Sequence, residues 1–185
     1  NIKYCFNGDF SIMSELRTNR IIPRDGLPAG SAGGIIQVRQ GTLTSKFNTA
    51  SSTMVDSGLS VTITPTRSDS KILVQVSLGS LSNNERQKRA FMNIVRDSTN
   101  VLVGDAATGH EVTAAVCSRS ADDNHIQIPL SFMVLDSPAT TSATTYKVQL
   151  SRGTDSGTVY LNGSAGADAS AGNTASTIIV MEVSG

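Results

Sequence analysis

Residues 126–134, IQIPLSFMV, alternate between apolar and polar side chains more regularly than any other stretch of the chain. Apolar side chains fall at every second position from Ile126 to Val134. The positions between them include Gln127, Pro129 and Ser131. Successive side chains of a strand point to opposite faces of its sheet. This segment therefore predicts a strand that buries one face and exposes the other.

The two-residue period recurs along most of the chain, as in Leu59, Val61 and Ile63, and Pro65 follows this strand. The other expected strands are 35–40, 42–47, 71–78, 89–96, 100–103, 111–118, 146–150, 158–161 and 178–183. No stretch of ten residues has the 3.6-residue period of a helix. Eight to ten short strands at this spacing predict an all-β sandwich or barrel.

Two of the expected strands are apolar on both faces. They contain 92–95, MNIV, and 178–181, IIVM. In so small a domain, a strand with two apolar faces implies that another subunit covers the outer face. The pattern therefore predicts an oligomer.

The composition excludes several classes of protein. The chain has 185 residues, with 15 basic and 15 acidic side chains and a net charge of zero. A nucleic-acid-binding protein needs a basic surface, which this balance does not provide. No apolar run approaches the roughly 20 residues that span a bilayer. Serine and threonine supply about a quarter of the positions, well above ordinary usage. These features favour a β protein that binds no nucleic acid and does not insert into membranes.

The first 34 residues differ from the rest of the chain. Residues 26–34 are rich in Gly and Pro, which predicts a linker between an extended arm and a domain at 35–185. Met13 could be the initiator, and residues 1–12 would then be foreign to the native protein. Nothing in 1–30 resembles a secretory signal, so we expect folding in a cytoplasm.

No catalytic or metal-binding motif is present. Cys5 and Cys117 are far apart and form no CxxC pair, so we expect reduced thiols, with Cys117 packed as a small hydrophobe. His110 and His125 lie in no metal-binding spacing. The acidic loop 122–124 before His125 could hold calcium, but it lacks the usual ligand pattern, and a solvated turn explains it. No GxSxG motif and no pair of carboxylates suited to glycan hydrolysis stand out. We therefore expect no enzyme, cofactor or metal.

A set of segments resembles a known family. They are 33–38 GGIIQV, 58–65 GLSVTITP, 70–74 SKILV, 137–141 SPATT with 144–148 TTYKV, and 176–183 STIIVMEV. They resemble a domain common in marine bacteriophages, especially cyanophages, which occurs in tail-fibre-like and other virion structural proteins. The lead-in 16–23, LRTNRIIP, is similar to the arm that precedes this domain. The resemblance covers about residues 14–185.

The resemblance implies an antiparallel jelly roll similar to the C1q and tumour-necrosis-factor heads, assembled as a homotrimer. It also implies a virion protein that docks on other virion proteins through its arm. The expected task is attachment to a bacterial surface glycan or protein, as the head of a tail fibre or spike. The alternative is a capsid decoration protein that stabilises the phage head.

Strands that alternate in direction would bring both termini to one end of the domain. The loops expected at the other end are those around 41–53, 80–88, 104–110, 136–144 and 162–175. If the protein binds a receptor, Asn83, Asn84, Glu85 and Arg86 would be exposed at this end. Ordinary solvated turns would explain the same residues equally well.

Overall fold

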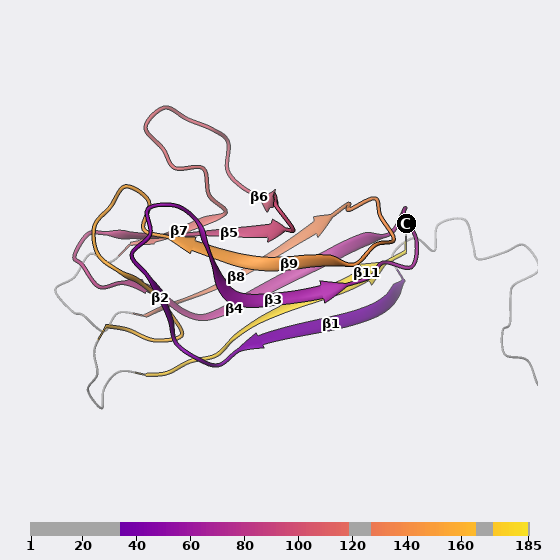
Figure 1. Cartoon of the computed structure of the whole chain (residues 1–185), viewed down its shortest axis with the longest axis horizontal. Coiled ribbons are helices and arrows are strands. Elements are labelled where there is room, and N and C mark those ends of the chain that lie inside the picture. The colour runs from indigo at the N-terminus through magenta and orange to yellow at the C-terminus, as the bar shows by residue number, and fades with distance from the viewer. Residues whose placement is uncertain (1–33, 119–126, 166–171, 185) are drawn as a thin grey trace, which may run out of the picture. The chain divides into compact units, whose positions relative to one another are not determined.

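The computed structural model describes residues 34–118, 127–165 and 172–184, which form eleven strands and no helix (Figure 1). The strands are β1 Ile35–Leu43, β2 Phe47–Thr49, β3 Val55–Ile63, β4 Lys71–Asn83, β5 Arg89–Arg96, β6 Thr99–Leu102, β7 Ala115–Ser118, β8 Ile128–Asp136, β9 Thr144–Ser151, β10 Val159–Leu161 and β11 Ser176–Val183. The expected arm at 1–33, including Cys5 and Met13, lies outside the described residues, as does the acidic loop with His125.

The all-β prediction is confirmed for the described residues, and most strands lie where the two-residue period predicted them. Three differ. The expected strand 42–47 does not form, because β1 continues through Leu43 and β2 begins only at Phe47. The strand expected at 71–78 extends to Asn83, because its last three residues pair with β10. Only Ala115–Ser118 of the weak segment 111–118 is a strand.

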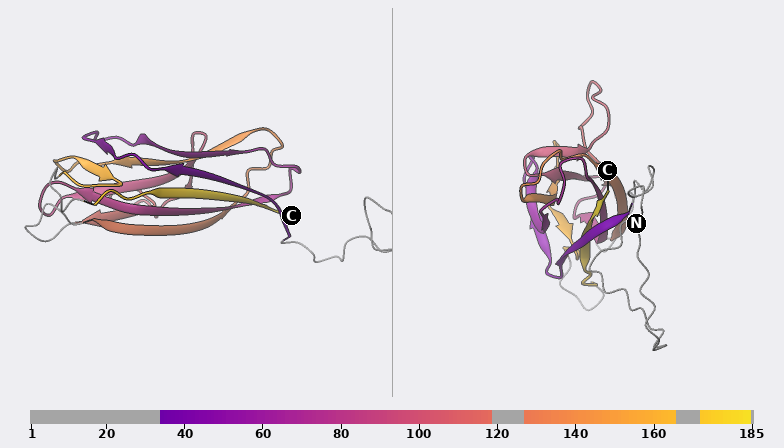
Figure 2. Two further views of the ribbon diagram at one scale, coloured as in Figure 1. Left: turned by 90° about the horizontal axis from the view of Figure 1, so that it is seen from below. Right: turned by 90° about the vertical axis from the view of Figure 1, so that its right-hand side faces the viewer.

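The strands form two antiparallel sheets. Sheet A has the order β1-β11-β4-β8. Nearer the tip, β10 takes the place of β11 beside β4, and β2 pairs with the other edge of β10. β4 is its central strand, since one edge pairs first with β11 and then with β10 while the other edge pairs with β8. Sheet B has the order β3-β9-β5, and both β6 and β7 pair with the outer edge of β5. Both sheets curve around one core (Figure 2).

The long-range pairs are nested. When the three-residue strands β2 and β10 and the strand β6, which follows β5 directly in a hairpin, are set aside, β1 pairs with β11 and β3 pairs with β9. Inside these pairs, β4 pairs with β8 and β5 pairs with β7. Thus the first of the eight remaining strands pairs with the last, the second with the seventh, and so on. Successive pairs belong to alternate sheets.

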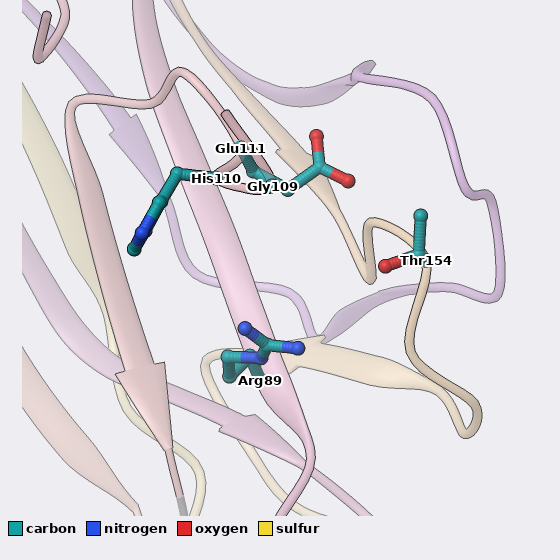
Figure 3. A pocket seen from close by; sticks show the side chains of 5 residues that line it. All are labelled: Arg89, Gly109, His110, Glu111 and Thr154. Atoms are coloured by element: carbon teal, nitrogen blue, oxygen red, sulfur yellow. The ribbon is translucent and has the colours of Figure 1, made fainter. Parts of the chain in front are cut away.

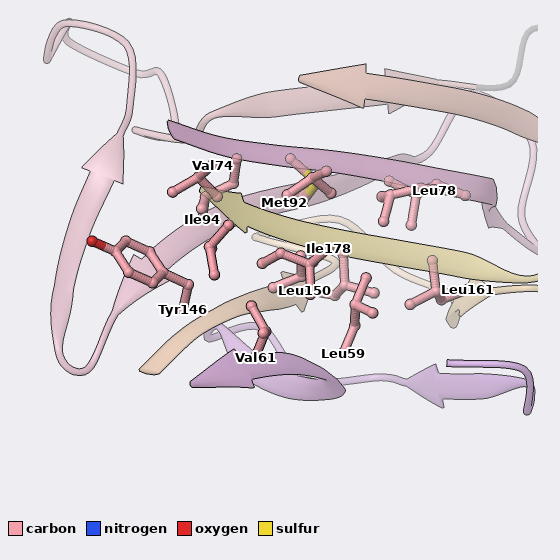
Figure 4. Close-up of a cluster of buried hydrophobic side chains, with 14 of the residues drawn as sticks. Leu59, Val61, Val74, Leu78, Met92, Ile94, Tyr146, Leu150, Leu161 and Ile178 are labelled. Atoms are coloured by element: carbon pink, nitrogen blue, oxygen red, sulfur yellow. The ribbon is translucent and has the colours of Figure 1, made fainter. Parts of the chain in front are cut away.

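The core lies between the sheets and is almost entirely aliphatic (Figure 4). Leu59 and Val61 of β3 face Val74 and Leu78 of β4 across it, and Tyr146 closes one end. Burial of apolar surface contributes about 25 cal/mol per Å² to folding. The alternating aliphatic positions found in the sequence supply this surface.

The two ends of the described domain lie side by side. Ser184 donates its backbone N–H to the carbonyl oxygen of Gly34 at 2.9 Å, and Ile35 pairs with Val183. We call this end of the domain the base (near the label C in Figure 1). The opposite end, where β4 ends at Asn83, is the tip.

The loop 136–144 lies at the base, so its predicted position at the far end was wrong. Asp136 pairs with Ile72 and Thr144 pairs with Ile63, and both partners are at the base ends of their strands. The prediction assumed that every strand reverses direction. However, β6 and β7 run in the same direction along one edge of β5, as do β10 and β11 along one edge of β4. Because β6 and β7 run in the same direction, the chain does not reverse between them. The loop 136–144 is therefore at the base and the loop 152–158 is at the tip, each at the end opposite to the one predicted.

Gly41 lies where β1 of sheet A crosses close to β3 of sheet B. A Cβ atom at this position would overlap the backbone carbonyl oxygen of Ser60 and would also crowd Ile178. Backbone atoms of a packed strand cannot move aside easily. This approach between the two sheets therefore requires glycine.

We predict that Gly41→Ala destabilises the domain by about 3 kcal/mol, because the added methyl group forces the two sheets apart. Chemical denaturation measures the change. Gly104→Ala is the matched control, since its Cβ would meet only an ordinary contact at 3.8 Å from the Thr113 carbonyl oxygen. It should change stability by less than about 1 kcal/mol. Equal stability of the two variants would contradict the close approach.

Candidate functional site

The tip loop expected to be exposed is partly built into the fold. Asn83 is only 3% exposed. Its side-chain Nδ2 donates to the carbonyl oxygens of Arg89 (2.9 Å) and Ser156 (3.2 Å), and its Oδ1 accepts from the N–H of Glu85 (3.0 Å). The prediction that Asn83 is exposed was wrong. Its side-chain amide turns inward, because it pairs with backbone groups of the tip loops that would otherwise lack hydrogen-bond partners.

Asn84 is half-buried and has a similar role. Its Oδ1 accepts the N–H of Thr158 at 2.6 Å, and its own N–H donates to the Thr158 carbonyl oxygen at 3.0 Å. Glu85 and Arg86 are exposed as predicted, and Glu85 accepts a hydrogen bond from the Ser156 hydroxyl. Of the four residues, Glu85 and Arg86 are therefore exposed, Asn84 is half-buried and Asn83 is buried.

The outer face of sheet A carries an ordered apolar surface. Strand register aligns Val38, Met181, Leu73 and Leu135 across β1, β11, β4 and β8. Val38 and Leu135 are 52% and 56% exposed, and the two middle residues are half-buried. We call these four residues the apolar row. A continuous line of large apolar side chains on a sheet surface is typical of an interaction face.

From the apolar row toward the tip, the side chains on this face become more polar. The row after the apolar row contains two apolar and two amide side chains: Gln40, Ile179, Gln75 and Met133. Met133 is 59% exposed. The third row contains hydroxyl side chains only: Thr42, Thr177, Ser77 and Ser131. The apolar surface is thus confined to the half of sheet A nearer the base.

The outer face of sheet B is polar where β3 and β9 pair. Lys147 donates to Asp56 at 2.8 Å, and Gln149 donates to the other carboxylate oxygen at 2.6 Å. These hydrogen bonds lower the pKa of Asp56. The hydroxyls of Thr62 and Thr145 lie 2.8 Å apart on the same face. The outer face of the β3–β9 pair is therefore polar, in contrast to the apolar row on sheet A.

The two strands that are apolar on both faces have different explanations. In β5, the outward Asn93 is buried under the chain itself, because its Oδ1 accepts the N–H of Ala114 at 3.1 Å. Phe91 is buried beneath the turn at Gly153. For β5 the inference of a covering subunit was therefore wrong. In β11, Ile179 and Met181 remain half-exposed on the outer face of sheet A.

A partly buried polar cluster joins the sheets at the base. Arg96 of β5 donates from Nη1 to both oxygens of Asp136 of β8, at 2.9 and 2.7 Å. The hydroxyl of Tyr146 of β9 donates to Asp136 at 2.7 Å. Burial, followed by the adjacent carboxylate, raises the pKa of Tyr146. The phenol therefore stays protonated and acts as a fixed donor to the carboxylate.

Glu182 of β11 is a second carboxylate at the base, and it is buried. It accepts hydrogen bonds from the Gln37 amide and from the N–H and hydroxyl of Thr66, each at 2.7 Å. Burial acts to raise its pKa, but these hydrogen bonds outweigh burial and lower the pKa to about 2. The charged carboxylate therefore holds the loop before β4 against β1 and β11.

The described residues contain one buried thiol, no cluster of metal ligands and no membrane-spanning helix. No group of three or more His, Cys, Asp or Glu side chains that could hold a metal occurs among them. Cys117 packs in the core as predicted, and burial raises the pKa of its thiol to about 11. The search for a helix able to cross a membrane found none in the described part of the chain.

Comparison with known proteins does not assign the chain to a family. No family model matches the sequence, and no curated protein is significantly similar to it.

We predict that Glu182→Gln destabilises the domain by about 2 kcal/mol at pH 7, since it removes hydrogen bonds to a charged acceptor. The pKa of Glu182 is about 2 in the folded state against an ordinary 4.5. Its stabilising effect is therefore complete above pH 4.5 and is lost as the pH falls toward 2.

Denaturant titrations at several pH values test this prediction. The stability of the wild type should fall more steeply than that of Glu182→Gln as the pH drops through this window. Asp69→Asn is the control, since Asp69 pairs with Arg67 in an exposed ion pair at 2.7 Å. Exposed ion pairs of this kind contribute little to stability, because water screens them. Parallel pH curves for the wild type and Glu182→Gln would contradict the assigned role.

Proposed function

We propose that the domain is a jelly roll of the C1q and tumour-necrosis-factor type, as the sequence resemblance implies. The supporting observation is the nested pairing of β1 with β11, β3 with β9, β4 with β8 and β5 with β7. This order arises when one long antiparallel ribbon is rolled up so that successive pairs fall in alternate sheets. A simple meander would pair neighbouring strands instead.

The domain assembles as a homotrimer through the outer face of sheet A. The supporting observation is the apolar row, which leaves Val38 and Leu135 more than half exposed in the single chain. Water contact with such a surface is unfavourable, and association of copies removes it. The zero net charge of the chain allows copies to approach without long-range repulsion.

The trimer is a virion structural protein, the head of a phage tail fibre or spike that attaches to a bacterial surface. The virion assignment rests on the motifs that resemble marine phage proteins. The fold supports this arrangement. The chain enters the described domain at the base, at Gly34, and the tip loops lie at the opposite end. Three copies of each tip loop would bind a repetitive surface with avidity. Capsid decoration is the alternative.

We predict that the wild-type chain sediments as a trimer and that Leu135→Asp sediments as a monomer. The aspartate would place three charges in the apolar contact, where each would lose its hydration. Thr62→Asp is the matched control, because it adds the same charge to an exposed position on sheet B. It should remain trimeric. A monomeric wild type, or a trimeric Leu135→Asp, would contradict the interface.

Immunogold electron microscopy of virions with antibodies against this chain tests the location. We expect label at the ends of tail fibres or spikes, since a head that binds cells must project from the particle. Label distributed over the capsid would overturn the attachment function and support the decoration alternative.

A further inference from the structure

A polar hollow of about 290 Å³ opens at the tip, on the outer side of sheet B. It is lined by Arg89, Gly109, His110, Glu111 and Thr154 (Figure 3). These residues come from the start of β5, the loop between β6 and β7, and the loop between β9 and β10. Three separate segments therefore build one site that the proposed trimer face on sheet A does not include.

The Arg89 guanidinium is held in one orientation. Its Nε and Nη2 donate to the two oxygens of Asp155, at 2.8 and 3.2 Å, and its backbone N–H donates to the same carboxylate at 2.9 Å. The cation also lies 5.6 Å from the centre of the Phe91 ring. A planar guanidinium fixed on one edge keeps its remaining N–H donors for a ligand.

The loops above the guanidinium contain tight turns. Gly153 has a φ of +59° and packs directly on the Phe91 ring, close to the carboxylate of Glu111. Gly109 has a φ of +78°, and His110 donates its N–H to the Ala107 carbonyl oxygen at 3.1 Å. The turns aim Glu111 and Thr154 at one opening (Figure 3). The hollow thus presents an oriented guanidinium beside the oxygen atoms of Glu111 and Thr154.

The charges around the hollow balance. Arg89 and Lys88 lie 2.8 and 4.0 Å from Asp155, and Glu111 adds a second carboxylate. Two cations thus face two anions. A phosphate or an acidic sugar in the hollow would meet the Glu111 carboxylate beside an Arg89 cation that Asp155 already pairs, and would find no unpaired excess of positive charge. A ligand with many hydroxyl groups and no charge can accept from the guanidinium and donate to Glu111 at the same time.

We infer that this hollow binds an uncharged saccharide unit of a surface glycan. The inference rests on the proposed attachment function, which supplies glycans as the ligand class, and it names the subsite. The hollow is open and has no Phe, Tyr or Trp ring among its lining residues, so a single site binds weakly. Several copies in one assembly bind a repetitive polymer more strongly than one copy does.

The test uses the full chain labelled with ¹⁵N and a panel of methyl glycosides of glucose, galactose, mannose and N-acetylglucosamine. We expect at least one glycoside to shift the amide signals of Gly109, Glu111 and Thr154 in a saturable manner. Glu111→Gln keeps the shape of the side chain but removes its charge. It should weaken binding about tenfold, as expected for a lost hydrogen bond to a charged group. Thr154→Val should weaken binding less.

Asp69→Asn is the control for loss of one carboxylate, and it should bind the glycoside as the wild type does. Glucuronate and inorganic phosphate are the anionic probes, and neither should shift these signals. Binding of an anion in preference to every glycoside would overturn the inference. So would the failure of all four glycosides, or equal binding by the wild type and Glu111→Gln.

These measurements use the free chain, so they are independent of its place on the virion. Capsid label in the immunogold experiment would overturn attachment alone. Absence of glycoside binding together with label on tail fibres would overturn the hollow alone.

Discussion

Pairing of the first strand with the last is the constraint on which the rest of the structure depends. β1 and β11 are joined along eight register pairs, from Ile35 with Val183 to Leu43 with Ser176. Inside this pair, β3 pairs with β9, β4 with β8 and β5 with β7, and successive pairs alternate between the two sheets. The same pairing puts both ends of the described domain at the base. It leaves the tip to loops whose length and composition can vary without disturbing the core.

The register of these pairs also determines the surface. Because Val38, Met181, Leu73 and Leu135 align across four strands, residues scattered through the sequence form one apolar row. A shift of one residue in any strand would turn its member of the row toward the core. The partly buried Asp136 and the buried Glu182 lie at the base, where their hydrogen bonds tie loops and strands of both sheets. Fold stability and the proposed assembly therefore depend on the same strand pairs.

The sequence predicted the positions of most strands because alternation is a local property that a buried face imposes on each strand. It could not predict which strands pair, and the assumption of regular reversal misplaced the loop 136–144. It also could not predict that Asn83 turns inward, or that a loop buries Asn93, because both depend on distant partners. Arg89, Glu111 and Thr154 are far apart in sequence and carry no motif. Only the fold brings them to one hollow.

The central claim is that a second copy of the chain covers the outer face of sheet A. Methionine oxidation by peroxide, followed by mass spectrometry, tests it most directly. Met133 is 59% exposed in the single chain, whereas Met92 is fully buried in the core. If copies cover the face, Met133 of the wild type will oxidise almost as slowly as Met92, and Leu135→Asp will restore fast oxidation. Fast oxidation of Met133 in the wild type at every protein concentration would contradict the claim.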